Sequence, residues 1–192
     1  ATLFGSDAQV GYEYDGKEYS GKFPHTPLGN NHCTQCHSPT LTEHTFLPDD
    51  NLAYCQACHG GITDIEQIRV GSNEDYNGNG TTDESLHDEL AGLAEALYDE
   101  IRAAADDNGT PLFYDGHAYP YFFKDNGRGA NFGNRFTAWT PALLKAAHNY
   151  QHSQMEPGAW AHNFAYIAQL VIDSIEDLGG DVDEFVRPPV EY

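Results

Sequence analysis

All four cysteines of this 192-residue chain lie in two copies of one pentapeptide, Cys33-Thr-Gln-Cys36-His37 and Cys55-Gln-Ala-Cys58-His59. Cys-x-x-Cys-His is the attachment sequence for c-type haem, whose vinyl groups bond to both thiols and whose iron takes the histidine as an axial ligand. A redox dithiol pair, a zinc site and two disulfides are the alternatives. None of these requires a histidine after each second cysteine. The motifs therefore predict two covalent haems on Cys33, Cys36, Cys55 and Cys58, with His37 and His59 as proximal iron ligands.

Two six-coordinate haems need two further axial ligands, and eight other histidines are available for them. The single methionine, Met155, is the less favoured alternative, so we expect bis-histidine coordination. We rank His44 and His162 first as distal ligands, although a histidine on an apolar helical face, like His162, is often only a core residue. His32 follows, because it can reach the second haem if the two are stacked. His25 and His152 come next, and we expect His87 and His117 to be solvated.

A second pattern of ligand residues lies at residues 75–84, Asp-Tyr-Asn-Gly-Asn-Gly-Thr-Thr-Asp-Glu. Oxygen-bearing side chains at positions 1, 3 and 5, with glycine at position 6, match the first half of an EF-hand calcium loop. Leu86 stands where the closing glutamate belongs, so Glu84 or Asp83 would have to close the site. The sequence predicts a structural calcium site formed by Asp75, Asn77, Asn79, Thr81 and Glu84, and the alternative is an Asn-Gly-rich turn before a helix.

The charge of the chain excludes several classes of protein. It has 30 acidic and 9 basic side chains, for a formal net charge of −21. Phosphate backbones and anionic lipid surfaces repel such a chain, so we expect neither nucleic-acid binding nor adsorption to a membrane. The longest apolar stretch, residues 164–172, is about half of what spans a bilayer. Haem attachment of this kind takes place outside the cytoplasm, so we expect export through a cleaved signal peptide to the cell surface or beyond, with the periplasm as the alternative.

The pattern along the chain predicts one domain over residues 1–192, mainly α-helical with extensive irregular loops and centred on haem. Alternating Val10, Tyr12 and Tyr14 before Asp15-Gly16 predict a small β-hairpin in an N-terminal arm, residues 1–23. A haem-attachment segment follows at residues 24–62, and a helical part at residues 84–180. Helices are expected from Leu86 to Asn108, from Thr140 to about His152, and from Trp160 to Leu178. The aromatic, glycine-rich stretch 110–139 between them either covers porphyrin or is a surface loop.

Several runs of sequence resemble modules of the extracellular multihaem c-type cytochromes of metal-respiring prokaryotes. These runs are residues 29–37 leading to 42–46, the 75–80 loop, and the C-terminal runs 149–151, 157–163 and 173–178. Some cytochromes of that kind polymerise into filaments, the extracellular cytochrome nanowires. The resemblance implies electron transfer, but it does not by itself show polymerisation. We expect a homo-oligomer, and in a filament of that kind a histidine such as His25 can ligate haem across a subunit interface. The chain departs from that family in haem count, because it has attachment sites for only two.

Three functional hypotheses follow. The first is a di-haem electron carrier that exchanges electrons with redox partner proteins or extracellular acceptors, either as a filament subunit or as a soluble protein; it needs no catalytic residue. The second is a di-haem peroxidase or reductase, which requires one open iron and a distal acid or base. The third is a calcium-stabilised haem scaffold. The short distance between the motifs and the excess of histidines favour the first.

Overall fold

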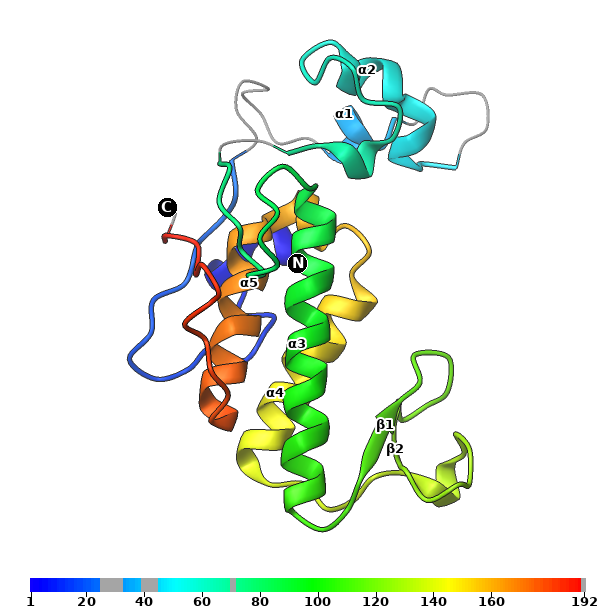
Figure 1. Cartoon of the computed structure of the whole chain (residues 1–192). Helices are drawn as coiled ribbons and strands as arrows, with labels where there is room; N and C mark the ends of the chain where they lie inside the picture. Colours follow the sequence, from blue (N-terminus) through cyan, green and yellow to red (C-terminus); the bar gives the residue numbers. More distant parts are fainter. Residues whose placement is uncertain (25–32, 39–44, 70–71, 191–192) are drawn as a thin grey trace.

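The computed structural model describes residues 1–24, 33–38, 45–69 and 72–190. Three long helices form its body: α3 (Leu86–Asp107), α4 (Pro141–Met155) and α5 (Ala159–Leu178). They run side by side, and the N-terminal 3-10 helix η1 (Thr2–Asp7) packs on α5 (Figure 1). Helix α3 has 22 residues and is therefore about 33 Å long. This length separates the two ends of the body.

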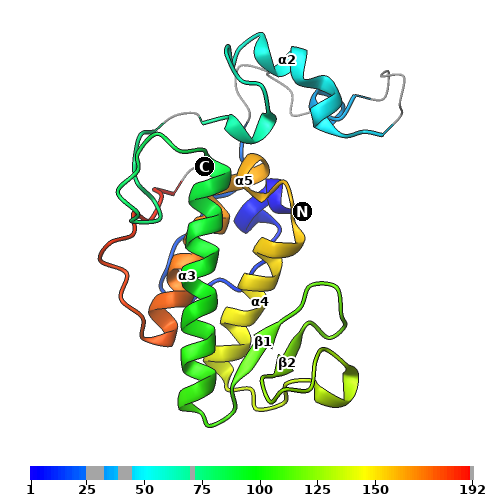
Figure 2. The same cartoon turned by 45° about the vertical axis from the view of Figure 1, so that its right-hand side comes forward.

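Different segments occupy these two ends (Figures 1 and 2). The attachment segment, which in the structure extends to Arg69, lies beyond the N-terminal end of α3. Its described residues contain four short helical elements: α1 (Cys33–Cys36), η2 (Pro48–Asn51), α2 (Leu52–Gln56) and η3 (Ile65–Gln67). The opposite end carries a two-stranded antiparallel sheet, β1 (Leu112–Tyr114) with β2 (Phe122–Lys124), followed by η4 (Phe132–Asn134). Leu112 pairs with Lys124 and Tyr114 with Phe122. The aromatic stretch 110–139 therefore lies away from the attachment motifs rather than over them.

The predicted helices are confirmed, and their ends follow from local chemistry. The Ser85 hydroxyl accepts a hydrogen bond from the amide of Asp88 and caps α3, while that of Thr140 accepts from Leu143 ahead of Pro141 and caps α4. Gly179 ends α5 in the left-handed conformation, with φ of 91°. The mainly α-helical class is therefore confirmed for the described residues.

The core of the body combines aliphatic and aromatic side chains, most of them from the three helices. The buried residues include Leu93, Leu97, Ile101, Leu143, Ile167, Leu170 and Ile175. The attachment motifs lie outside this core, at the end of the body. The prediction that porphyrin replaces part of the core is therefore not confirmed: the three helices pack against one another with side chains of their own.

The predicted N-terminal β-hairpin is wrong, because residues 8–23 contain no strand. Their backbone amides bond to side chains of the body or of the segment itself instead of to a second strand. Gly11 donates to the hydroxyl of Tyr166 (3.2 Å), Tyr12 to Asn149 Oδ1 (2.7 Å) and Ser20 to Gln169 Oε1 (2.9 Å). These side chains satisfy the amides that a hairpin would have paired, so the segment lies along α4 and α5.

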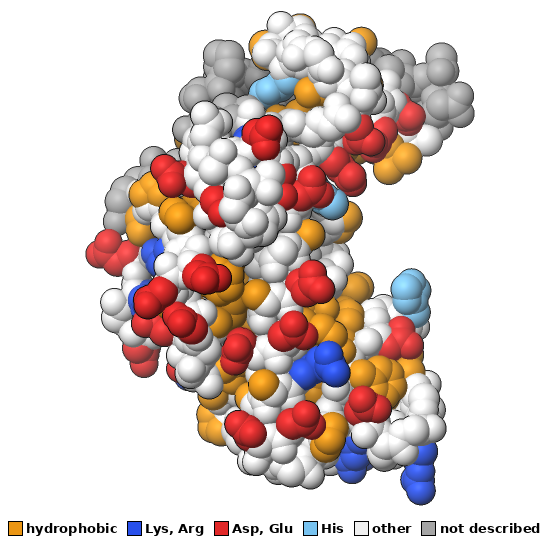
Figure 3. All heavy atoms as spheres, viewed as in Figure 1, with side chains coloured by type: hydrophobic (Ala, Val, Ile, Leu, Met, Phe, Trp, Pro, Cys, Tyr) orange, Lys and Arg blue, Asp and Glu red, His pale blue; other side chains and the backbone are white. Residues whose placement is uncertain are grey.

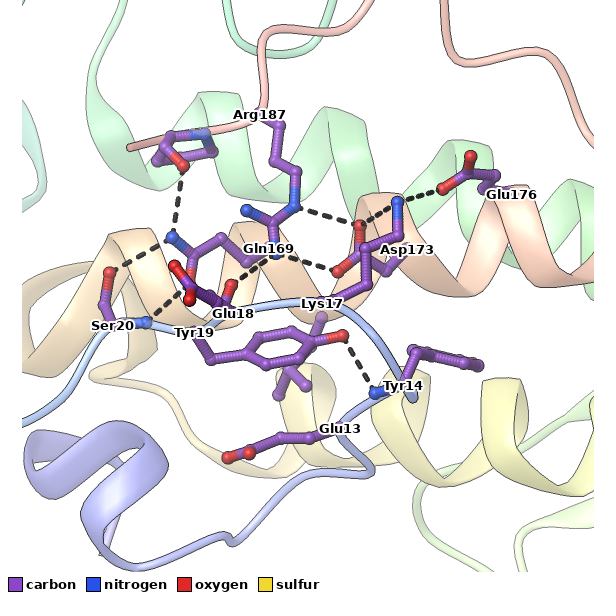
Figure 4. Close-up of polar contacts among 12 residues, drawn as sticks. Glu13, Tyr14, Lys17, Glu18, Tyr19, Ser20, Gln169, Asp173, Glu176 and Arg187 are labelled. Carbon is purple, nitrogen blue, oxygen red and sulfur yellow. Dashed lines mark hydrogen bonds and ion pairs between the residues drawn. The ribbon is translucent and has the colours of Figure 1, made fainter. Parts of the chain in front are cut away.

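One buried carboxylate on α5 joins the N-terminal and C-terminal segments (Figure 4). Arg187 binds both oxygens of Asp173, at 2.9 Å each, and donates to the carbonyl of Glu18 at 2.8 Å. Lys17 approaches the same carboxylate at 3.5 Å and also pairs with the exposed Glu176. The Asp173 side chain is fully buried, and among the described residues Arg187 and Lys17 balance its charge.

Breaking this buried pair should therefore destabilise the protein. We expect Asp173→Asn to lower the free energy of unfolding by about 3 kcal/mol, because it leaves the Arg187 charge without its partner. Glu176→Gln removes a carboxylate that contacts the same lysine but is half exposed, and should cost less than about 1 kcal/mol. Urea unfolding of the haem-loaded chain measures both values, and equal losses in the two variants would contradict this account.

Candidate haem site and calcium loop

Each attachment motif forms a single helical turn. The amide of His37 donates to the carbonyl of Cys33 at 2.8 Å, and that of His59 donates to Cys55 at 2.9 Å. A turn of this kind brings both thiols of a motif and its histidine close together along one short stretch of backbone. All four cysteines are free thiols, exposed or half-buried, so each can be reached by a large reactant. The disulfide alternative is not supported.

The two motifs pack against each other. The side-chain amide of Asn51, directly before α2, donates to the carbonyls of Gln35 (2.7 Å) and Cys36 (3.3 Å). Burial raises the pKa of the Cys36 thiol, and the nearby Cys55 thiol raises it further. Groups attached at the two motifs would therefore be neighbours.

His37 faces a histidine from the distant helix α5. Its ring lies 6.2 Å, centre to centre, from the ring of His162. Two imidazoles that share one metal, each with a nitrogen about 2 Å from it, have ring centres about 6 Å apart. The Nδ1 of His37 lies 2.7 Å from the Phe46 carbonyl, which can only accept, so Nδ1 carries the proton and Nε2 is left for a ligand bond.

His162 has the same arrangement with a stronger acceptor. Its Nδ1 lies 3.1 Å from Glu156 Oε1, and Thr2 donates to the other oxygen of that carboxylate at 3.1 Å. The hydrogen bond with His162 is the main cause that lowers the pKa of Glu156, to about 2, so the carboxylate is ionised. It therefore accepts the Nδ1 proton, and Nε2 of His162 is also free.

The other candidate ligands fall into two groups. His25, His32 and His44 lie outside the described residues, so their ranking stays a prediction. His152 is half-buried with its Nε2 3.3 Å from the Thr2 hydroxyl, and partial burial lowers its pKa. His117 is fully exposed on the stretch between α3 and α4, and Met155 is more than half exposed at the end of α4. The structure gives His59 no second histidine among the residues that it describes.

Sequence reasoning missed Glu156, and it expected His87 to be solvated, whereas the His87 side chain is only partly exposed. Glu156 precedes Pro157-Gly158 and lies six residues before His162, so an acidic residue in the turn before a histidine-bearing helix was the available signal. His87 begins α3 at the end that faces the attachment segment, 3.9 Å from the Glu66 carboxylate and 6.4 Å from the ring centre of Trp160. It lines a hollow of about 210 Å³ that Glu156 and Trp160 also line.

The 75–84 loop gathers four of its five predicted side chains. The Asp75 carboxylate accepts from the amides of Asn79 (3.1 Å) and Gly80 (2.6 Å). Glu84 Oε1 accepts from the side-chain amides of Asn77 (2.6 Å) and Asn79 (2.9 Å). Calcium would need the oxygens of these two side-chain amides, and Asn77 Oδ1 instead accepts the backbone amide of Asn79 at 3.0 Å. Thr81 takes part only through its backbone amide, which donates to Asn79 Oδ1.

A buried ion pair connects this loop to the attachment segment. The amides of Tyr76 and Asn77 donate to Glu89 Oε2, at 2.9 and 3.0 Å, and Arg69 donates to the other oxygen at 2.7 Å. Glu89 is fully buried on α3. Arg69, two residues after η3, thus fixes the end of the attachment segment to both α3 and the loop.

The described residues contain neither a cluster of metal-ligating side chains nor a membrane-spanning helix. Across 1–24, 33–38, 45–69 and 72–190, no three His, Cys, Asp or Glu side chains converge as metal ligands, so the zinc alternative finds no support. Each helix in this part of the chain is too short or too polar to cross a bilayer.

The chain is similar to curated polyhaem cytochromes over nearly its whole length. It is 31% identical over 210 aligned residues to C-type polyheme cytochrome OmcC, and 29% identical to C-type polyheme cytochrome OmcB, both of Geobacter sulfurreducens. Both alignments cover 91% of this chain but only 24–25% of the relative, so the chain spans about a quarter of the length of the proteins it matches. No family model and no solved structure matches it. The resemblance to multihaem c-type cytochromes is confirmed.

Proposed function

We propose that this relative of the polyhaem c-type cytochromes carries two covalent haems and passes electrons between them and external redox partners. The observation that carries the proposal is the His37–His162 pair, with ring centres 6.2 Å apart and both Nδ1 atoms engaged elsewhere. Bound haem supplies a one-electron couple whose potential the axial ligands and their hydrogen bonds set. The residues fit such a group, because each histidine is free at Nε2 and the thiols are accessible.

In this proposal the chain's own residues hold a closed iron site. The Phe46 carbonyl holds His37 and the Glu156 carboxylate holds His162, and each bond fixes the tautomer that leaves Nε2 for a ligand bond. For the second motif, His59 is the proximal ligand and its distal partner comes from His44, His32 or His25, or from His87. Two closed irons suit electron transfer, whereas a peroxidase or reductase needs one open position.

The location and assembly of the protein belong to the same proposal. Covalent haem attachment supports a site of action at the cell surface or outside the cell, with the periplasm as the alternative. A soluble carrier fits the structure as well as a filament subunit does. Polymerisation and ligation across a subunit interface stay predictions of the resemblance.

Replacing His162 tests the function directly. In the haem-loaded chain, we expect His162→Ala to convert one of the two haems to a high-spin form that binds carbon monoxide when reduced, because its sixth ligand is lost. Unaltered protein should not shift its Soret band with carbon monoxide. His117→Ala, at a fully exposed histidine, is the matched control.

Two results would contradict the proposal. Carbon monoxide binding by the unaltered protein would indicate an open iron and favour the enzyme. A variant lacking His162 that keeps two low-spin haems would assign the distal position to another histidine.

The Glu156 carboxylate should tune the same haem. Hydrogen bonding to a carboxylate makes an imidazole a stronger donor, which stabilises the oxidised metal. Glu156→Gln should therefore raise the midpoint potential of one haem, by on the order of 60 mV for a tenfold loss of that stabilisation. Spectroelectrochemical titration measures it, with Glu95→Gln on the exposed face of α3 as control. Equal potentials in both variants would show that Glu156 does not act on a haem ligand.

The proposal also includes one calcium ion in the 75–84 loop. Calcium that binds only the folded chain adds about 2.7 kcal/mol of stability at 100 times its dissociation constant. We expect calcium to raise the melting temperature of the haem-loaded chain, Asp75→Ala to abolish this rise, and Glu95→Gln to leave it intact. Absence of both heat and a melting shift on calcium titration would show that the loop is only a turn.

A further inference from the structure

Residues 110–139, between α3 and α4, form an arm of the molecule that is distinct from the N-terminal segment 1–23. Its inner face is firmly attached to the body. The amide of Tyr114 donates to the hydroxyl of Tyr98 on α3 at 2.8 Å, and its ring meets the ring of Tyr150 on α4 edge-on, with centres 5.1 Å apart. Phe122, Phe123 and Phe136 are buried. The arm is therefore part of the folded structure.

The outer face of the arm presents aromatic rings to solvent. Tyr119 is 72% exposed and Phe132 is 58% exposed, and their rings stack nearly parallel with centres 6.3 Å apart. The guanidinium of Arg135 lies 4.4 Å from the ring centre of Phe132 and donates to its carbonyl at 2.9 Å. Tyrosine, phenylalanine and arginine are enriched at protein interfaces, and Tyr and Arg dominate binding hot spots.

The tip that carries these rings is held in one shape. The side-chain amide of Asn134 donates to the carbonyls of Lys124 (2.9 Å) and Arg128 (3.2 Å), and its oxygen accepts from Asn126 (2.9 Å). The side chain of Asn131 caps η4. A surface that is ordered in advance loses less entropy on binding a partner.

The arm also differs from the rest of the molecule in charge (Figure 3). The arm carries three of the 9 cationic side chains and two of the 30 carboxylates. The rest of the chain therefore carries six cations and 28 carboxylates. Five cations of the remainder form ion pairs: Lys17, Arg69, Arg102, Lys145 and Arg187. Lys124, Arg128 and Arg135 form none with any carboxylate that the structure describes. Its charge therefore complements an acidic partner.

We propose that the outer face of the arm docks on the acidic surface of a second copy of this chain. Helix α3 offers such a surface, because Asp88, Glu95, Asp99, Asp106 and Asp107 are all exposed on it. At physiological ionic strength charges act over about 8 Å, so the local charge of the arm rather than the −21 of the whole chain governs the contact. The arm lies at the end of the body opposite the attachment segment, so this docking does not depend on how haem is ligated.

Sedimentation velocity of the haem-loaded full chain over a concentration series tests the proposal. We expect reversible self-association in 150 mM salt that weakens in 1 M salt. Arg135→Glu and Tyr119→Ser should each weaken it at least tenfold. Lys22→Glu makes the same change of charge at a cation outside the arm that also lacks an ion pair among the described residues, and should leave association unchanged. Unaltered circular dichroism and haem absorption establish that the variants fold and keep their haems.

Three results would overturn the proposal. The first is a chain that is monomeric at every concentration, and the second is association that is equally strong in the Arg135→Glu and Tyr119→Ser variants. The third is a monomer that heparin retains through Arg135 and Tyr119, which would replace the second copy by another polyanion. If the chain does not associate and its carbon monoxide response is as proposed, only the docking surface fails. If the chain associates as proposed and its carbon monoxide response is not the expected one, only the haem ligation fails.

Discussion

Helix α5 is buried along almost its whole length, yet it carries polar side chains that must find partners inside the protein. Asn163 donates to the carbonyl of Gly21, Gln169 binds the backbones of Ser20 and Pro188, and Asp173 binds Arg187. The N-terminal and C-terminal segments supply these partners. Both segments are irregular, and they follow α5 because their backbone groups are satisfied there.

The same helix brings the candidate haem ligand to the attachment segment. His162 lies in the first turn of α5, beside the end of α4 that carries Glu156. Thr2, from η1, donates to Glu156 and thereby adds the N-terminus to the support of this histidine. The position of the ligand thus depends on the packing of α4, α5 and η1. Arg69 and Glu89 play a comparable part for the other end of the attachment segment, which they join to α3.

The two ends of the body have different surface chemistry. One end bears the thiols and the His37–His162 pair, and the other bears the stacked rings of Tyr119 and Phe132 beside cations that pair with no carboxylate in the described part of the chain. The three helices between them supply most of the buried core, and Leu112, Phe122 and Phe136 of the arm join it, so the body holds the arm and the attachment segment apart. Redox chemistry and association can then be altered by separate substitutions.

The sequence alone determined the features whose causes lie within a few residues. Two Cys-x-x-Cys-His motifs predict covalent haem wherever they lie, and the caps Ser85 and Thr140 with Gly179 place helix ends through hydrogen bonds and backbone conformation close by. Tertiary structure decided what depends on distant partners. The expected hairpin at residues 8–23 is absent because Tyr166, Asn149 and Gln169, more than 130 residues away, take the amides that a strand would have paired. Only the packing of α5 could place His162, rather than another histidine of similar local sequence, opposite His37.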